Sequence, residues 1–259
     1  MIKHNFWIFG DSFGVPNDIT SYYHNLKKSY PNLPDKQDIV GSEWVQYVAK
    51  ALGYQYDLVF NMSKHGTSAD GYMMRLFRMI QKEAIRPGDF VLITATAETR
   101  FQYSDDIEGK FDWNDPYKNG HLKHFHSLGA QQWIGQKDSV LTTAPDCLYT
   151  YMNKYQDYTW LAYAHWMKHE FIKGYLDSLN IDSLIVQGIA CRQDTLPENK
   201  LGWGKQPNPL LLIQESIKEY KIKEDEQFHM YQIFTNHLDP KQNKIYADQI
   251  IEYYNEHKP

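Results

Sequence analysis

The sequence predicts an α/β fold with a central parallel sheet that is covered by helices on both faces. Short apolar runs at residues 5–9, 56–60 and 90–95 alternate with helix-like segments at 42–53 and 69–84. A strand, helix, strand, helix, strand order is typical of parallel strands joined by crossover helices. Ligands of such sheets bind at the carboxyl ends of the strands.

Local signals support the elements of the first half. The first run ends in Gly10 and Asp11, which is typical of a buried strand followed by a tight turn. Residues 15–41 contain three prolines, so we expect an irregular segment before the helix that Ser42 opens and Gly53 ends.

The second half is less regular. Residues 102–150 show no clean period, and we interpret them as an insertion of loops and short elements that forms a cap over the carboxyl edge. A helix at 157–179 and a strand at 183–188 follow, then a loop at 192–209 and a final amphipathic helix at 241–257. We predict one domain over all 259 residues.

Composition excludes several classes of protein. Hydrophobic residues make up 42% and charged residues 23%, a globular balance, and the net charge of −5 provides no field that attracts nucleic acid. Two cysteines are too few for a disulfide scaffold, and no nucleotide-binding glycine pattern is present. The sequence shows no signal peptide and no apolar stretch of about 18 residues, so we expect synthesis in the cytosol and no membrane insertion.

Ser12 is the first candidate for chemistry. A serine hydroxyl becomes a nucleophile when a base accepts its proton, and donors must stabilise the oxyanion that develops. A turn after a strand can present both the Oγ and the backbone N–H, and Gly10 and Gly14 allow the backbone to bend tightly around Ser12.

Three motifs in chain order resemble the blocks of the GDSL or SGNH hydrolase family. Gly10-Asp11-Ser12-Phe13 is similar to the first block, and residues 61–68, with Asn61 and Gly66, are similar to the second. His237-Leu238-Asp239-Pro240 is similar to the last block. The resemblance implies a three-layer α/β/α, flavodoxin-like fold, a Ser12 nucleophile, a His237 base, a Gly66 oxyanion donor and no metal or organic cofactor.

Two positions depart from the family pattern. The family has an Asp three residues before its catalytic His, where this chain has Phe234. Either Asp239 is recruited in its place, or a backbone carbonyl orients the ring and leaves a Ser12–His237 dyad. The family also has an Asn after the third strand, where this chain has Glu98, and an ionised carboxylate cannot donate a hydrogen bond.

Another group would then supply the third oxyanion donor, and its loss would slow the reaction on the order of 10²–10³-fold. Thr96, Thr99 and Arg100 are the candidates, and Arg100 would alternatively recognise an anionic substrate. The predicted oxyanion- and substrate-binding residues are Asp11, Asn61, Gly66, Thr96, Glu98, Thr99 and Arg100.

The resemblance implies ester hydrolysis through an acyl-serine intermediate. Aromatic-rich, lysine-poor loops favour an O-acetylated carbohydrate among the acylated sugars and small esters that the family hydrolyses. The alternative is an inactive protein of the same fold that serves as a glycan-binding or structural component of a larger assembly, which the two departures favour.

The histidines give weaker signals. His121, His124 and His126 are crowded, and His165 and His169 are an i, i+4 pair on one helix face. Neither group has a third metal ligand at a diagnostic spacing, so we interpret both as surface or interface histidines.

Overall fold

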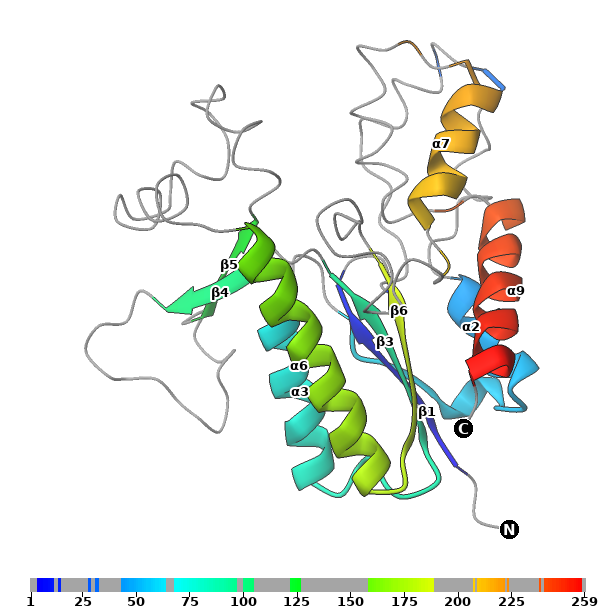
Figure 1. Ribbon diagram of the computed structural model, residues 1–259. Helices are drawn as coiled ribbons and strands as arrows, with labels where there is room; N and C mark the ends of the chain where they lie inside the picture. Colours follow the sequence, from blue (N-terminus) through cyan, green and yellow to red (C-terminus); the bar gives the residue numbers. More distant parts are fainter. Residues whose placement is uncertain are drawn as a thin grey trace.

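The computed structural model has an α/β fold with helices on both faces of a four-stranded parallel sheet (Figure 1). The strands are β1 (Phe6–Gly10), β2 (Val59–Asn61), β3 (Phe90–Ala95) and β6 (Asp182–Gln187), in the spatial order β2-β1-β3-β6. This is the order of the first four strands of a flavodoxin-like sheet. The predicted fold class is confirmed.

The structure describes residues 4–11, 14, 28, 31–32, 43–63, 68–96, 100–104, 122–126, 158–188, 207, 209–221, 223, 238 and 240–257.

The central strands β1 and β3 are buried on both faces. Alternate residues point to opposite sides, so Phe6 and Ile8 pack in one core cluster while Trp7 and Phe9 pack in the other. Phe6 lies in register with Phe90 of β3, and their rings stack with centroids 5.3 Å apart. Such continuously apolar strands are typical of a parallel sheet between two helical layers.

Within the described ranges, five helices make up these layers. The face with Phe6 and Ile8 is covered by α2 (Glu43–Ala51), α7 (Pro209–Glu219) and α9 (Pro240–His257). The opposite face is covered by α3 (Ala69–Gln81) and α6 (Tyr158–Ser178), which lie side by side (Figure 1).

A buried carboxylate fastens the amino edge of the sheet. Asp89, directly before β3, accepts hydrogen bonds from the Asn5 backbone N–H at 2.8 Å and from Trp7 Nε1 at 3.1 Å. It also accepts from the Arg86 backbone N–H at 3.1 Å, which closes the turn after α3. Asp89 therefore joins the starts of β1 and β3.

All the predicted helices and strands except the strand at 56–60 are confirmed within a few residues. In the run at 56–60, residues Tyr56–Leu58 form a 3-10 turn, and pairing begins only at Val59 because three residues of this edge strand meet β1. Helix α7 was not predicted, although Pro209 at its first position is a common helix start.

The predicted insertion contains a two-stranded antiparallel ribbon. Strands β4 (Arg100–Ser104) and β5 (Leu122–His126) pair from Arg100 and His126 onward, and β4 lies beside α3. The rest of the insertion lies outside the described residues, as do most of the loops predicted at 15–41 and 192–209.

None of the helices in the described ranges combines the length and the hydropathy needed to span a membrane.

Replacing Asp89 by Asn tests the amino-edge anchor. An amide nitrogen would face at least one of the N–H donors that the carboxylate now accepts from. We expect Asp89→Asn to lower the free energy of unfolding by about 1–3 kcal/mol, measured by urea denaturation. An unchanged urea midpoint would show that the anchor contributes nothing.

Candidate active site

The carboxyl ends of β1 and β3 meet at the switch point of the sheet. The chain goes from β1 to β2 on one side and returns across β1 to β3 on the other. In sheets of this kind, the crevice at the switch point is where ligands bind. The sequence continues from the end of β1 into Asp11 and Ser12, and from the end of β3 into Thr96.

A buried hydrogen bond joins these two strand ends. The Thr96 hydroxyl donates to Oδ2 of Asp11 at 2.9 Å, and both residues have 0% exposure. The Gly14 N–H donates to the Asp11 carbonyl at 3.2 Å, which holds together the two described residues that flank Ser12 and Phe13. The residue before Ser12 is thus fixed to the end of β3.

Gly10 is required by close approach to β3, whereas Gly14 lies against the rotatable side chain of Ser63. A Cβ on Gly10 would lie 1.7 Å from Thr94 Oγ1, and one on Gly14 would lie 2.4 Å from Ser63 Oγ. Left-handed backbone occurs among the described glycines only at Gly53 and Gly88. The hydrogen bond from the Gly14 N–H to the Asp11 carbonyl is the i to i+3 contact of a tight turn, which agrees with the predicted bend. Packing of Gly10 against Thr94 is a second reason for a glycine there.

Asn61 connects the end of β2 with the segment after Ser12. Its Nδ2 donates to the Gly14 carbonyl at 2.6 Å, and its Oδ1 accepts from the Ser63 N–H at 3.0 Å. The second family-like motif therefore contacts the residue that directly follows the first one. These contacts give Asn61 a role in holding the backbone, and substrate binding by Asn61 stays a prediction.

Helix α9 contributes a buried tyrosine to the same edge. The Tyr246 hydroxyl donates to the Gln187 carbonyl at the end of β6, at 2.5 Å. Burial, and then the charge of Asp11, raise the pKa of Tyr246 well above its usual value. Tyr246 also shares its core cluster with Leu238, the residue after His237.

Leu238 is held firmly. It is buried, and its carbonyl accepts a hydrogen bond from Asn243 Nδ2 at 2.6 Å. Oδ1 of Asn243 in turn accepts from the backbone N–H of Trp44 at 3.1 Å, so this anchor joins α9 to the start of α2.

The prediction that His165 and His169 are surface or interface residues is wrong. They are only 7% and 1% exposed, because they belong to the inner face of α6 together with Ala162, Ile172 and Leu176. The helical spacing of these five residues is a signal from which their burial could have been predicted.

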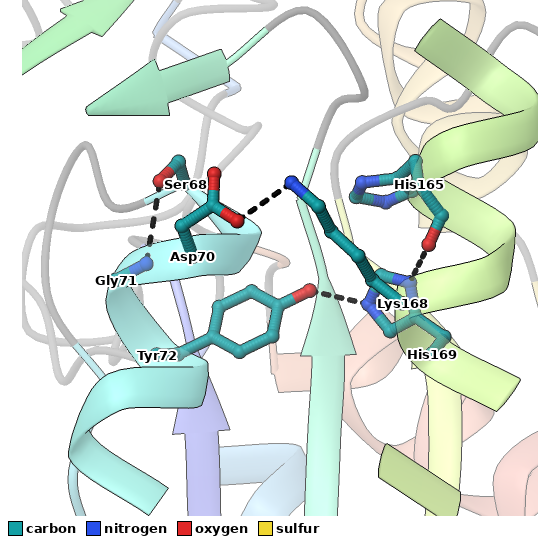
Figure 2. A network of polar contacts seen from close by, with 7 residues as sticks. All are labelled: Ser68, Asp70, Gly71, Tyr72, His165, Lys168 and His169. Atoms are coloured by element: carbon teal, nitrogen blue, oxygen red, sulfur yellow. Dashed lines mark hydrogen bonds and ion pairs between the residues drawn. The ribbon is translucent and has the colours of Figure 1, made fainter. Parts of the chain in front are cut away.

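His169 links α6 to α3. One ring nitrogen, Nδ1, lies 2.7 Å from the His165 carbonyl, and the other, Nε2, is hydrogen-bonded to the Tyr72 hydroxyl (Figure 2). A carbonyl only accepts, so Nδ1 carries the hydrogen, and in a neutral ring Nε2 accepts from Tyr72. Close by, Lys168 and Asp70 form a 2.6 Å ion pair whose side chains are 40% and 44% exposed.

Both histidines are held neutral. Burial lowers the pKa of His169 to about 4, against the opposing effect of the hydrogen bond to the His165 backbone. Burial, the His169 ring and Lys168 lower the pKa of His165 well below its usual value, against the opposing effect of the Thr96 backbone. The pair therefore connects Tyr72 with Thr96 without carrying charge.

The structure brings Asp11, Asn61 and Thr96 to the carboxyl edge, and Arg100 begins β4. The other predicted site residues lie outside the described residues: Ser12, Gly66, Glu98, Thr99, His237 and Asp239. The described part of the chain holds no group of three His, Cys, Asp or Glu side chains that could bind a metal. Both ring nitrogens of His169 are already engaged.

Comparisons with known proteins give likenesses in structure only. No family model and no curated protein matches the chain. One similar structure is that of a "putative GDSL-like lipase" from Parabacteroides merdae, 12% identical with a TM-score of 0.42, covering 98% of this chain and 96% of that one. Another is protein YXIM of Bacillus subtilis, 11% identical with a TM-score of 0.42, of which this chain spans 57%.

The neutral histidines predict acid sensitivity. The unfolded chain binds a proton at His169 below pH 6.5, whereas the folded chain does so only near pH 4. Stability is therefore complete above pH 6.5 and falls as the pH drops to about 4, with His169 contributing about 3 kcal/mol of the loss.

Urea denaturation of the wild type and His169→Gln at several pH values between 7.5 and 4 measures this effect. We expect a shallower decline in the variant, because its side chain does not titrate. Parallel declines would contradict the assignment.

Proposed function

We propose that the protein is an ester hydrolase in which Ser12 attacks an acyl group and His237 accepts its proton. The backbone N–H groups of Ser12 and Gly66 would stabilise the oxyanion, and water would release the acyl group from the serine. The observation on which the proposal rests is the buried Asp11–Thr96 hydrogen bond, which fixes the residue before Ser12 at the switch point.

The contacts between the motif-bearing segments support the proposal. Asn61, from the second motif, donates to Gly14, the residue that follows the first motif. Tyr246 packs in one cluster with Leu238 and lies close enough to Asp11 for its pKa to respond to that charge. A nucleophile, a base and an oxyanion donor from distant parts of a chain need such convergence to act on one substrate.

The same contacts narrow the choice of the third oxyanion donor. A threonine hydroxyl has a single hydrogen, and that of Thr96 is donated to Asp11. We therefore infer that Thr99 or Arg100, rather than the Thr96 side chain, takes the place of the family's Asn. Arg100 in this role would bring a positive charge to the oxyanion.

The substrate class that we propose is an acylated carbohydrate, with an O-acetylated glycan as the first to test, or a small ester. Acyl transfer through a serine needs no metal or organic cofactor. The competing proposal, a non-catalytic glycan-binding or structural protein of this fold, differs in one property, because its Ser12 would not be activated.

Ser12→Ala tests the nucleophile. We expect release of acetate from an acetylated polysaccharide, and turnover of p-nitrophenyl acetate, to fall to the uncatalysed rate, because no covalent intermediate forms. A fluorophosphonate probe should label the wild type and not the variant. A wild-type chain that neither labels nor hydrolyses, yet retains acetylated glycan in a pull-down, would favour the non-catalytic protein.

Asp239→Asn distinguishes the dyad from a triad. The dyad predicts a kcat within a few fold of the wild type, because a backbone carbonyl orients His237. A loss of about 10⁴-fold, the scale expected when a triad carboxylate is replaced by an amide, would assign the orienting role to Asp239. His237→Gln, assayed in parallel, sets the level at which the base is absent.

A further inference from the structure

A chain of buried polar contacts runs from α3 to the residue before Ser12. Tyr72 donates to His169, whose Nδ1 donates to the His165 carbonyl at 2.7 Å (Figure 2). The His165 ring packs edge-on against the His169 ring, with centroids 4.4 Å apart, and lies close enough to the Thr96 backbone for that backbone to raise its pKa. The Thr96 hydroxyl in turn donates to Asp11 at 2.9 Å. The chain thus joins α3, α6 and the ends of β3 and β1.

The hydrogen bonds at the two ends of the chain have defined donors and acceptors. Its last acceptor is the Asp11 carboxyl, and its first donor is a phenol hydroxyl. In a buried network, the loss of one partner leaves a polar group unsatisfied, and this costs about 1–3 kcal/mol. The arrangement therefore resists displacement of Thr96 and Asp11.

The other end of the chain lies beside the second motif. Tyr72 is in the first turn of α3, whose N-cap is Ser68, the last residue of that motif. Ser68 Oγ accepts from the Gly71 N–H at 3.3 Å. The Lys168–Asp70 ion pair ties the same turn of α3 to α6, although its half-exposed side chains give it a modest share of the stability.

We propose that His165 and His169 are positioning residues of the candidate active site, which hold Thr96 and Asp11 and thereby fix the residue that precedes Ser12. This inference rests on the proposed function for its effect on catalysis. Both rings would act on catalysis only by holding Thr96 and Asp11, since neither ring is among the groups that would touch the substrate.

Tyr72→Phe removes the first donor and keeps the ring that packs between α3 and the sheet. We expect kcat on p-nitrophenyl acetate, and the rate of fluorophosphonate labelling, to fall about tenfold with KM unchanged, because a displaced nucleophile slows the chemical step. His169→Gln, which keeps an acceptor for Tyr72, should retain more activity than His169→Leu. Equal losses in these two variants would overturn the proposal.

Asp89→Asn is the matched control. It weakens a buried hydrogen-bond cluster of the same sheet at the opposite, amino edge. We expect it to lower the urea midpoint without changing kcat at a temperature where all variants are folded. If Tyr72→Phe at equal stability had the kcat of Asp89→Asn, the network would be structural only, and the proposal would be wrong.

A readout that does not need activity separates this inference from the proposed function. In ¹H–¹⁵N spectra, Tyr72→Phe should shift the amide signals of Asp11 and Thr96, and Asp89→Asn should leave them in place. If Tyr72→Phe shifts these signals but the fluorophosphonate probe never labels the wild type, the positioning network is supported and the hydrolase is rejected. If Tyr72→Phe leaves the signals unshifted while the probe labels the wild type, the hydrolase is supported and the positioning network is rejected.

Discussion

Burial of both faces of the parallel sheet is the constraint on which the rest of the structure depends. Every residue of strands β1 and β3 is buried, so charged groups of the sheet are confined to its two ends. At the amino edge, Asp89 gathers three N–H donors and fastens the sheet. At the carboxyl edge, a second buried carboxyl, Asp11, occupies the position where such sheets bind ligands.

The carboxyl groups at the two ends of the sheet accept hydrogen bonds from different kinds of donor. Asp89 accepts mainly from backbone N–H groups that lie near it in the fold whatever the side chains are. Asp11 accepts from a side chain, Thr96, which is itself held by residues of α6. The amino edge is thus a local anchor, whereas the carboxyl edge depends on the packing of α3 and α6 against the sheet.

The sequence was sufficient to predict the elements whose signals are local. The runs that became β1 and β3 are continuously apolar and end in turn residues, and both were predicted correctly. The pairing of β2 was not predictable to the residue, because an edge strand begins where its neighbour meets it. Within the candidate site, the order of Asp11, Asn61 and Thr96 along the chain was informative, because parallel strands bring their carboxyl ends together.

The contacts among those residues could not be predicted, since they depend on tertiary distances. The local sequence does not show that a side chain at position 14 would meet Ser63, or that Thr96 donates to Asp11. The i, i+4 spacing of the α6 histidines is shared by metal-binding and core residues, so the pair alone does not predict burial. Their helical phase with Ala162, Ile172 and Leu176 would have assigned them to the core.

The chemistry of the inner face of α6 bears on why these histidines are there. Apolar side chains of similar volume would fill the space between α6, α3 and the sheet, and replacing buried polar groups in this way is often neutral or stabilising. The two rings instead favour the folded state only while they are neutral, because burial disfavours their charged form. Packing therefore does not account for them. What an apolar residue could not do is accept the hydrogen bond from Tyr72 or place a polar ring beside the Thr96 backbone, and these two features connect α3 to the strand ends beside Ser12.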